Sequence, residues 1–564
     1  MNSYNRKDCS PDETIKHIKN ILEKNNIKVK ESEIINIDNS IFSVRVELKN
    51  ISGVGTNGKG ISRELALASA YAEFMERLQS KFLVKSNFLN KEITKSFKDE
   101  YYLEYEEFVK KFSKVKGNYY IKKLVENNSS YRYYTKFYDV LNDKYIELPI
   151  KLINLLTHSN GLCSGNSKEE ALVQGICEIL ERHCYKEILL KENYMPNIVV
   201  NNLEKVEVYN QLMELKKLGL EYEIKDCSLN GKFPVVGLVI YDKNRENYIF
   251  TIGSDPDFNI ALQRCITEAF QGLKTDEIMN KMKPVKNSYY NMKKIYGKDF
   301  LQDNWLKCYS SNTGIHPSSF FNNRSEINLE RLPFYTVKNN KKALEFILNI
   351  LQKYNLSVYI KDYSYLGFDT YKIYIPTLSE VDEIDPLSFE ISSNMETLRN
   401  TYFNIYKTKY NSNEVFEKVF LHLAKSIKYN KFILPSNIFN VNDYIQCDYL
   451  KLNYLYVLIV ELLLTKQYDK IISVIDYQLE NYEVTDYEKE YLLSIKSEVN
   501  TVGSKRIKQK SVFAKDASFL VNHTERYLNK LKAPTCPDCK KCRCKMRCKY
   551  KEWKIINELV YRNS

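Results

Sequence analysis

Residues 169–182, EEALVQGICEILER, carry polar side chains at every third or fourth position of a stretch that is otherwise apolar. Two further stretches repeat this pattern, ELALASAYAEFMERL at 64–78 and IALQRCITEAFQGL at 260–273. The spacing places the polar side chains on one face of an α-helix. Because a helix that is apolar over the rest of its surface is buried, the glutamates on it need a cationic partner. We therefore expect metal ions between these glutamates, with a phosphate ligand on the metal.

A solvated helix face is the alternative interpretation for each stretch. A single Glu-x-x-Glu-Arg pattern usually forms ion pairs between residues three and four positions apart. Arg77 and Arg182 could neutralise Glu73 and Glu178 in this way. However, the pattern recurs three times, and five or more glutamates against three arginines leave an excess of negative charge. We therefore favour a metal site over three unrelated surface helices.

The chain of 564 residues is long enough for about two to four domains. Its N-terminus has no apolar core and does not resemble a signal peptide. The longest apolar run, at 454–464, is too short for a membrane span and carries a glutamate. We expect a cytoplasmic protein without a membrane partner, in which the 13 cysteines are thiols or metal ligands.

Strand and helix signals alternate over the first two thirds of the chain, which predicts an α+β fold with a mixed sheet and packed helices. Ser10 and Glu13 form a capping box that opens a helix ending near residue 24. The glycine-rich stretches at 53–62 and 159–167 are expected to be loops in front of the first two polar helices. Strands are expected at 42–48, 235–241, 248–253, 357–361 and 371–375, and a helix at 341–354.

Strand signals stop near residue 390, and helical patterns follow up to residue 500. They predict an all-α, repeat-like domain of antiparallel helices. We therefore divide the chain into a catalytic domain (1–388), a helical domain (389–503) and a basic, cysteine-rich tail (504–564). The helical patterns lie at 415–427, 448–465, 468–480 and 486–499.

The stretch 55–60, GTNGKG, invites comparison with a P-loop. It lacks the GxxxxGK[ST] spacing, so we exclude a Walker A site. Two interpretations of Lys59 stay open. Its ammonium either contacts phosphate or lies in solvent at a glycine turn between strand and helix.

Taken in order, the three polar patterns resemble the YcaO family. They read Ser-x3-Glu-x2-Glu-Arg at 69–77, Gln-x3-Glu-x2-Glu-Arg at 174–182 and Arg-x3-Glu-x2-Gln at 264–271. The resemblance covers roughly residues 9–385 and implies a YcaO-type ATP-binding fold. It implies an enzyme that uses ATP to phosphorylate a backbone amide oxygen of a ribosomally made peptide or protein. The products would be those of cyclodehydration or thioamidation.

An accessory role is the alternative that the same resemblance implies. One subgroup of the family carries helical repeats after its catalytic domain, as 389–503 would here. That subgroup is described as an accessory factor for methylthiolation of a ribosomal protein. Such a protein would bind nucleotide and serve a partner enzyme.

The resemblance also assigns roles to residues, whereas the catalytic residue and the nucleophile stay unassigned. Paired glutamates one turn apart suit Mg²⁺, and arginine forks suit phosphate. The implied Mg²⁺ ligands are Glu73, Glu76, Glu178 and Glu181. The implied ATP contacts are Ser69, Asn166, Glu170, Gln174, Arg182, Arg264, Glu268 and Gln271.

Five cysteines lie within 13 residues of the tail, and their CxxC spacing predicts a thiolate metal site for zinc or an Fe–S cluster. Residues 501–564 hold 17 Lys+Arg and 5 Asp+Glu, which is nearly all of the net charge of +13. We expect this tail to contact nucleic acid or the ribosome. Further expected partners are a peptide or protein substrate, a sulfur-delivery or accessory protein, and a second copy of the chain in a homodimer. The cysteines are Cys536, Cys539, Cys542, Cys544 and Cys548.

Overall fold

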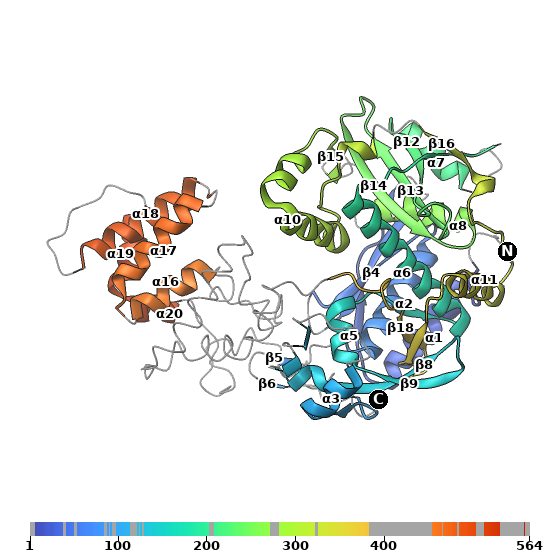
Figure 1. The fold of residues 1–564 in the computed structure, drawn as a ribbon, viewed down its shortest axis with the longest axis horizontal. Coiled ribbons are helices and arrows are strands. Elements are labelled where there is room, and N and C mark those ends of the chain that lie inside the picture. Colours follow the sequence, from blue (N-terminus) through green and yellow to red (C-terminus); the bar gives the residue numbers. More distant parts are fainter. Residues whose placement is uncertain are drawn as a thin grey trace.

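The computed structural model describes most of the first two thirds of the chain and several C-terminal helices (Figure 1). Gln271, the helical pattern at 415–427 and the five tail cysteines lie outside the described residues. The described residues are 6–37, 41–49, 53–83, 87–88, 91–92, 97–112, 121–122, 125–126, 129–201, 208–270, 281–321, 325–382, 454–464, 466–481, 484, 486–502, 513–530 and 558.

The first layer of the fold is a four-stranded antiparallel sheet covered by two helices. Ser10 caps the first helix as predicted, because it accepts a hydrogen bond from the Glu13 amide and Glu13 accepts one from the Ser10 amide. The sheet has the order β1-β3-β2, and β4 pairs with β3. The elements are α1 (Pro11–Lys24), β1 (Val29–Glu31), β2 (Ile35–Ile37), β3 (Ile41–Leu48), β4 (Gly55–Gly60) and α2 (Arg63–Gln79).

A second sheet has the strand order β10-β18-β17-β8-β7, and β9 pairs with β8. A small pair, β5 (Asn87–Phe88) and β6 (Lys91–Glu92), lies outside it. The elements around this sheet are β7 (Tyr101–Tyr102), α3 (Tyr105–Phe112), β8 (Tyr133–Asp139), β9 (Lys144–Leu148), α5 (Ile150–Thr157), β10 (Leu162–Gly165), α6 (Lys168–Lys191), β17 (Tyr359–Asp362) and β18 (Asp369–Tyr374).

A third sheet has the order β15-β14-β13-β12-β11-β16, and the predicted hairpin forms its β13 and β14. The long helix α6 contacts β10 and β18 of the second sheet and β13 and β14 of the third, so it lies between the two sheets. The elements are β11 (Asn197–Val199), α7 (Tyr209–Lys217), β12 (Glu221–Asp226), β13 (Val235–Tyr241), β14 (Asn247–Ser254), α8 (Phe258–Ala269), β15 (Lys283–Pro284), α10 (Tyr289–Ser311), β16 (Glu326–Asn328) and α11 (Asn340–Lys353).

Both glycine-rich stretches that we expected to be loops contain strands, so that prediction is wrong. β4 covers the first stretch and β10 lies within the second. Within the first of these strands, glycine is needed for close packing on the following helix. A Cβ on Gly58 would lie 2.0 Å from the Ala66 carbonyl oxygen and 2.7 Å from the Ala70 Cβ.

The three polar helices begin in the same way, each with a strand followed by a side-chain cap. The caps are Ser62 before α2, Ser167 before α6 and Asp257 before α8, and each accepts a hydrogen bond from a backbone amide of the first turn. In two of the three units, a threonine six residues before the cap donates a hydrogen bond to the helix carbonyl eight residues after the cap. These bonds are Thr56 to Ala70 at 2.8 Å and Thr251 to Cys265 at 2.9 Å.

The C-terminal helices confirm three of the predicted helical patterns. Two more helices lie in the stretch that we assigned to the tail, and they contact α18 and α16, so the helical part continues to Lys530. Among the described residues, no helix is long and apolar enough to cross a membrane. The C-terminal helices are α16 (Tyr454–Leu464), α17 (Tyr468–Asn481), α18 (Asp486–Asn500), α19 (Ala514–Asn522) and α20 (Thr524–Lys530).

Candidate functional site

The polar faces of α2, α6 and α8 meet at the centre of the larger part, where Figure 1 shows β4, α2 and α6 together. In the three units, the acidic side chains follow the cap at the same number of residues, so they occupy equivalent positions on their helices. A glutamate follows the cap by eleven positions in every unit, which gives Glu73, Glu178 and Glu268. A second acid follows by fourteen positions in the first two units, which gives Glu76 and Glu181.

Ion pairs join these helices to one another and to β4. Arg264 of α8 lies 3.8 Å from Glu181 of α6. Lys59 of β4 pairs with Glu268 of α8, so its ammonium is held in the cluster and does not lie free at a solvated turn. The fields of Glu178 and of Glu73 both act on Glu76, which places α2 and α6 side by side at this point.

Each of the first two helices also neutralises its own glutamates. Arg77 lies 3.3 Å from Glu73 and 3.5 Å from Glu76, and Arg182 lies 2.5 Å from Glu178. These are the intrahelical pairs of the alternative interpretation, and they coexist with the convergence of the three helices.

The charge excess that we expected from the sequence is not present, so that part of the prediction is wrong. Counting glutamates against arginines left out two lysines that the fold adds, Lys59 and the fully buried Lys372 of β18. Five carboxylates then face five cations within the cluster: Glu73, Glu76, Glu178, Glu181 and Glu268 against Arg77, Arg182, Arg264, Lys59 and Lys372.

Burial sets the protonation of several groups in this cluster. Burial raises the pKa of Glu76 to about 8, and the charge of Arg77 offsets it only in part. Burial likewise raises the pKa of Glu181, against the charge of Arg264. Burial and the charge of Arg264 lower the pKa of Lys59 to about 8. At neutral pH Glu76 is therefore largely protonated, although five basic side chains surround the cluster.

The donor set of the cluster fits magnesium and a triphosphate. Mg²⁺ prefers carboxylate oxygens, and Glu73, Glu76, Glu178 and Glu181 would hold it. The buried Nη1 of Arg77 has no hydrogen-bond partner in the structure, so it could donate a hydrogen bond to a phosphate oxygen. When bound, the metal would neutralise triphosphate charge.

Asn166, Glu170 and Gln174 form a second group at the start of α6, in which Glu170 lies about 12 Å before Glu178 along the helix axis. This group binds the N-terminal segment, which sequence reasoning missed. Lys7 donates to Glu170 at 3.0 Å and to Gln174 at 3.4 Å, while the Asp8 amide donates to Glu170 at 2.9 Å. Asn166 also donates to Glu170, and it accepts a bond from Thr14.

A buried pair next to this segment fixes it to the third unit. Arg6 donates to both carboxylate oxygens of Asp255, at 2.7 and 2.5 Å, and only 7% of each side chain is exposed. Burial raises the pKa of Asp255 to about 6, against the charge of Arg6. No signal in the sequence pointed to this pair, because its partners are 249 residues apart.

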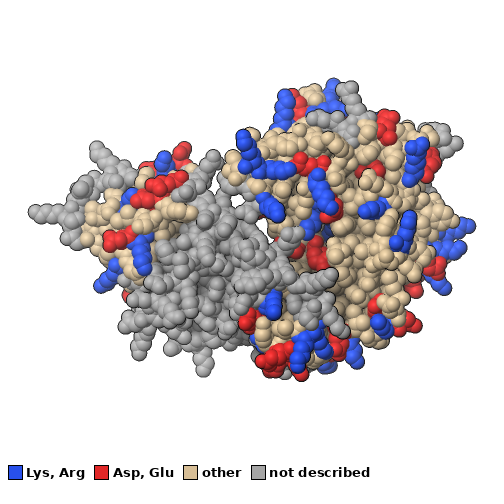
Figure 2. Space-filling model, in the orientation of Figure 1, with Lys and Arg blue, Asp and Glu red and all other residues tan. Residues whose placement is uncertain are grey.

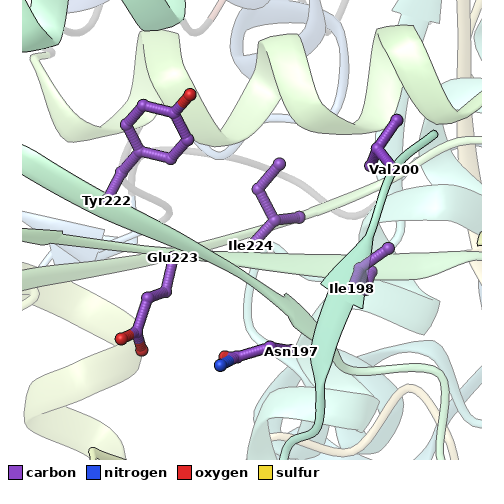
Figure 3. Close-up of a pocket in the computed structure, with 6 residues that line it drawn as sticks. All are labelled: Asn197, Ile198, Val200, Tyr222, Glu223 and Ile224. Atoms are coloured by element: carbon purple, nitrogen blue, oxygen red, sulfur yellow. The ribbon is translucent and has the colours of Figure 1, made fainter. Parts of the chain in front are cut away.

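Cavities elsewhere in the described part have a different character. A hollow of about 210 Å³ lies where β11 and β12 diverge, and Figure 3 shows its lining. Its single carboxylate, Glu223, is already paired with Lys225 and Arg245. Figure 2 shows acidic and basic side chains interspersed over the visible described surface, without a large patch of one sign. The helix cluster therefore remains the candidate site.

The structure brings most of the expected residues to this cluster or to its neighbouring group. Ser69 lies partly buried on α2, one turn before Glu73. Gln271 lies outside the described residues. Among the described residues, no group of three or more His, Cys, Asp or Glu side chains forms a ready-made metal cage. The assigned roles therefore stay predictions.

Comparison with protein families matches residues 57–379 to the family described as "YcaO cyclodehydratase, ATP-ad Mg2+-binding". The protein of Escherichia coli (strain K12) named ribosomal protein S12 methylthiotransferase accessory factor YcaO is 23% identical over 419 residues, which cover 71% of this chain and 70% of that protein. An uncharacterized protein of Haemophilus influenzae (strain ATCC 51907 / DSM 11121 / KW20 / Rd) is 26% identical over 289 residues, which cover 47% of this chain and 49% of that protein.

Among solved structures, YcaO from Methanopyrus kandleri bound with AMPPCP and Mg²⁺ is 16% identical to this chain. The superposition covers 67% of this chain and 95% of that one, with a TM-score of 0.44.

Proposed function

This chain belongs to the YcaO family, and on that premise we propose that it is an ATP- and Mg²⁺-dependent enzyme that activates a backbone amide of a ribosomally made peptide or protein. The observation that carries the proposal is the cluster of five glutamates and five basic side chains on three helices and two strands. The glutamates of this cluster would hold Mg²⁺, and its arginines would donate hydrogen bonds to phosphate oxygens, in place of the ion pairs that these side chains now make with one another.

The chain's own residues would then do the positioning that phosphoryl transfer needs. Arg182 and Arg264 would donate forked hydrogen bonds to phosphate oxygens, which would loosen their contacts with Glu178 and Glu181. The amide oxygen would take the γ-phosphoryl group, and ADP would leave. A thiol, hydroxyl, sulfide or amine would add to the same carbonyl carbon, and phosphate would carry the oxygen away.

ATP turnover by the purified full-length chain tests this proposal. Glu73→Gln and Glu178→Gln should each lower Mg²⁺-dependent phosphate release by about 10²-fold, because each removes a carboxylate from the cluster. Glu187→Gln is the matched control, since Glu187 lies on the same helix and pairs with the exposed Lys191. Equal turnover by all four proteins would contradict the proposal.

The accessory function is the second candidate, and one observation favours it. The similarity to the Escherichia coli accessory factor covers 71% of this chain, a larger share than residues 57–379 make up. The chain also has a helical part after its family domain. Retention of ribosomal protein S12 or its methylthiotransferase by the immobilised chain, with ATP bound but not hydrolysed, would favour this function over the first.

A metal-bound tail remains part of both proposals. The five tail cysteines suit zinc or an Fe–S cluster through their thiolates. We also propose that the basic tail contacts a peptide, the ribosome or nucleic acid. A homodimer of the chain is a further proposal.

A further inference from the structure

Lys372 is a fully buried lysine on β18, the strand that contacts both α2 and α6. Its ammonium donates three hydrogen bonds: 2.8 Å to Thr157 Oγ1, 3.0 Å to the His158 carbonyl and 2.7 Å to the Asn160 carbonyl. Thr157 uses its own proton on the Ile153 carbonyl at 2.8 Å. All three ammonium protons therefore have an acceptor, and the acceptors lie at the end of α5 and in the turn that follows it.

The backbone of this turn has an unusual conformation, although it makes hydrogen bonds of its own, such as that from the Asn160 amide to the Thr157 carbonyl. His158 has a φ of +48° and a ψ of −127°, which is an unfavourable conformation for a residue with a side chain. Gly161, three residues later, has a φ of +80°. A strained turn persists only when surrounding contacts fix it, and the three bonds from Lys372 supply such contacts.

The turn carries Asn160 to the arginine of the second polar helix. Asn160 is fully buried, and its side-chain oxygen accepts a bond from Arg182 at 3.3 Å. Its side-chain nitrogen donates to the Ser379 carbonyl at 2.9 Å, which fixes the orientation of the amide. Arg182 is also held by Glu178 and lies over the ring of Tyr309, with 4.9 Å from the guanidinium carbon to the ring centre.

We propose that Lys372 is a positioning residue: it fixes the 157–160 turn and, through Asn160, sets where Arg182 presents its guanidinium to the transferred phosphate. This inference rests on the proposed ATP-dependent function, because Arg182 is the phosphate contact in it. No hydrogen bond among the described residues joins Lys372 to Arg182 or to the four glutamates that would bind Mg²⁺. Its hydrogen bonds therefore reach the cluster only through the turn, whereas its charge also acts directly on Glu178 and Arg182.

A double-mutant cycle with ATP turnover tests the inference. Lys372→Met leaves buried acceptors without donors and releases the turn, and it should lower kcat by about tenfold or more with little change in KM for ATP, because misplacing a catalytic group by about 1 Å has an effect of this size. In an Arg182→Met background the same change should have no further effect beyond about twofold, since a group that acts only through Arg182 has nothing left to position.

Two further variants make the cycle decisive. Lys361→Met is the matched control, because Lys361 lies directly opposite Lys372 in the β17–β18 pairing and is also buried, but bonds Thr135 and Asp99. It should leave kcat within about twofold of wild type. Asn160→Ala removes the acceptor of Arg182 and leaves the backbone oxygen that Lys372 binds, so it should reproduce the loss even if Lys372→Met does not fold.

Independent, multiplicative losses in the double variant would overturn the inference, as would an equal loss from Lys361→Met or no loss from Asn160→Ala. A wild-type chain that binds Mg²⁺-ATP without turning it over would contradict the proposed function alone. In that case the same variants are compared by their Kd for Mg²⁺-ATP. Non-additive effects of Lys372→Met and Arg182→Met on this Kd support the positioning role, and additive effects refute it.

Discussion

The close packing of β10 on α6 gives a quantitative prediction about how the polar helices are held. In the first and third units a glycine lies on the strand, Gly58 or Gly253, four residues before the cap. It faces Ala70 or Cys265 on the helix. In the second unit the sizes are reversed, with Cys163 on the strand and Gly175 on the helix.

Gly175→Ala should therefore overpack this contact. The new Cβ would lie 2.7 Å from the Cys163 sulfur, 2.8 Å from the Cys163 Cβ and 2.8 Å from the end of the Ile373 side chain. Because all three contacts are shorter than 3.0 Å, we take the upper part of the range for overpacking a core, about 2–3 kcal/mol, and alanine regains about 1 kcal/mol of helix propensity over glycine. We expect a net loss of about 1–2 kcal/mol in the free energy of unfolding.

Cys163→Gly alone should also destabilise, because it empties a buried space and loosens a strand. Combined with Gly175→Ala it recreates the arrangement of the other two units. The double variant should thus be more stable than the sum of the single effects by about 1–2 kcal/mol, which is within the range for residues in contact.

Urea unfolding followed by tryptophan fluorescence measures this coupling, because the buried Trp305 belongs to the same apolar cluster as Cys163 and Gly175's neighbour Ile373. Gly175→Ala with Cys227→Ala is the control cycle. Cys227 contacts Met195 and Gly237, so its effect should be additive. Additivity within about 0.3 kcal/mol for the Cys163 pair, or a Gly175→Ala variant as stable as wild type, would refute the packing argument.

Three further outcomes are expected. With a pKa of about 8, Glu76 is about nine tenths protonated at pH 7. Binding of Mg²⁺-nucleotide at pH 7 should thus release about one proton, and the affinity should rise up to about pH 8 and then level off. Calorimetry in two buffers measures the release, and a release that persists in Glu76→Gln would contradict this. Arg6→Ala leaves Asp255 buried without its cation, so the free energy of unfolding should fall by about 3 kcal/mol in urea titrations, and Asp255→Asn should restore part of it. Elemental analysis of the full-length chain should find zinc or iron that is lost when Cys536 and Cys539 are both changed to Ser; a metal-free wild type would end the tail hypothesis.

The repeated unit explains how the cluster acquires basic as well as acidic side chains. Three strand–cap–helix units with equal spacing place their acids at one level, and the third unit contributes Arg264 where the others have Gln174 and Ser69. The third unit thereby supplies a cation to Glu181 of its neighbour.

The sequence by itself determined the three polar helices, their caps and the acids on them. These features are local, because a helical period of 3.6 residues fixes which side chains share a face. The capping box at Ser10, the strand at 42–48, the hairpin and the helix at 341–354 followed for the same reason. The family resemblance also rested on such local spacing, and the family match at 57–379 confirms it.

Only the tertiary structure decided which charges face one another. Lys372 reaches a turn more than 200 residues away, Arg6 reaches Asp255 across 249 residues, and Lys59 meets a glutamate of the third unit. The strand nature of the two glycine-rich stretches was likewise hidden, because the atoms that exclude a side chain at Gly58 belong to the following helix. Charge balance and close packing depend on distances in space between segments far apart in the chain, and no local periodicity records those distances.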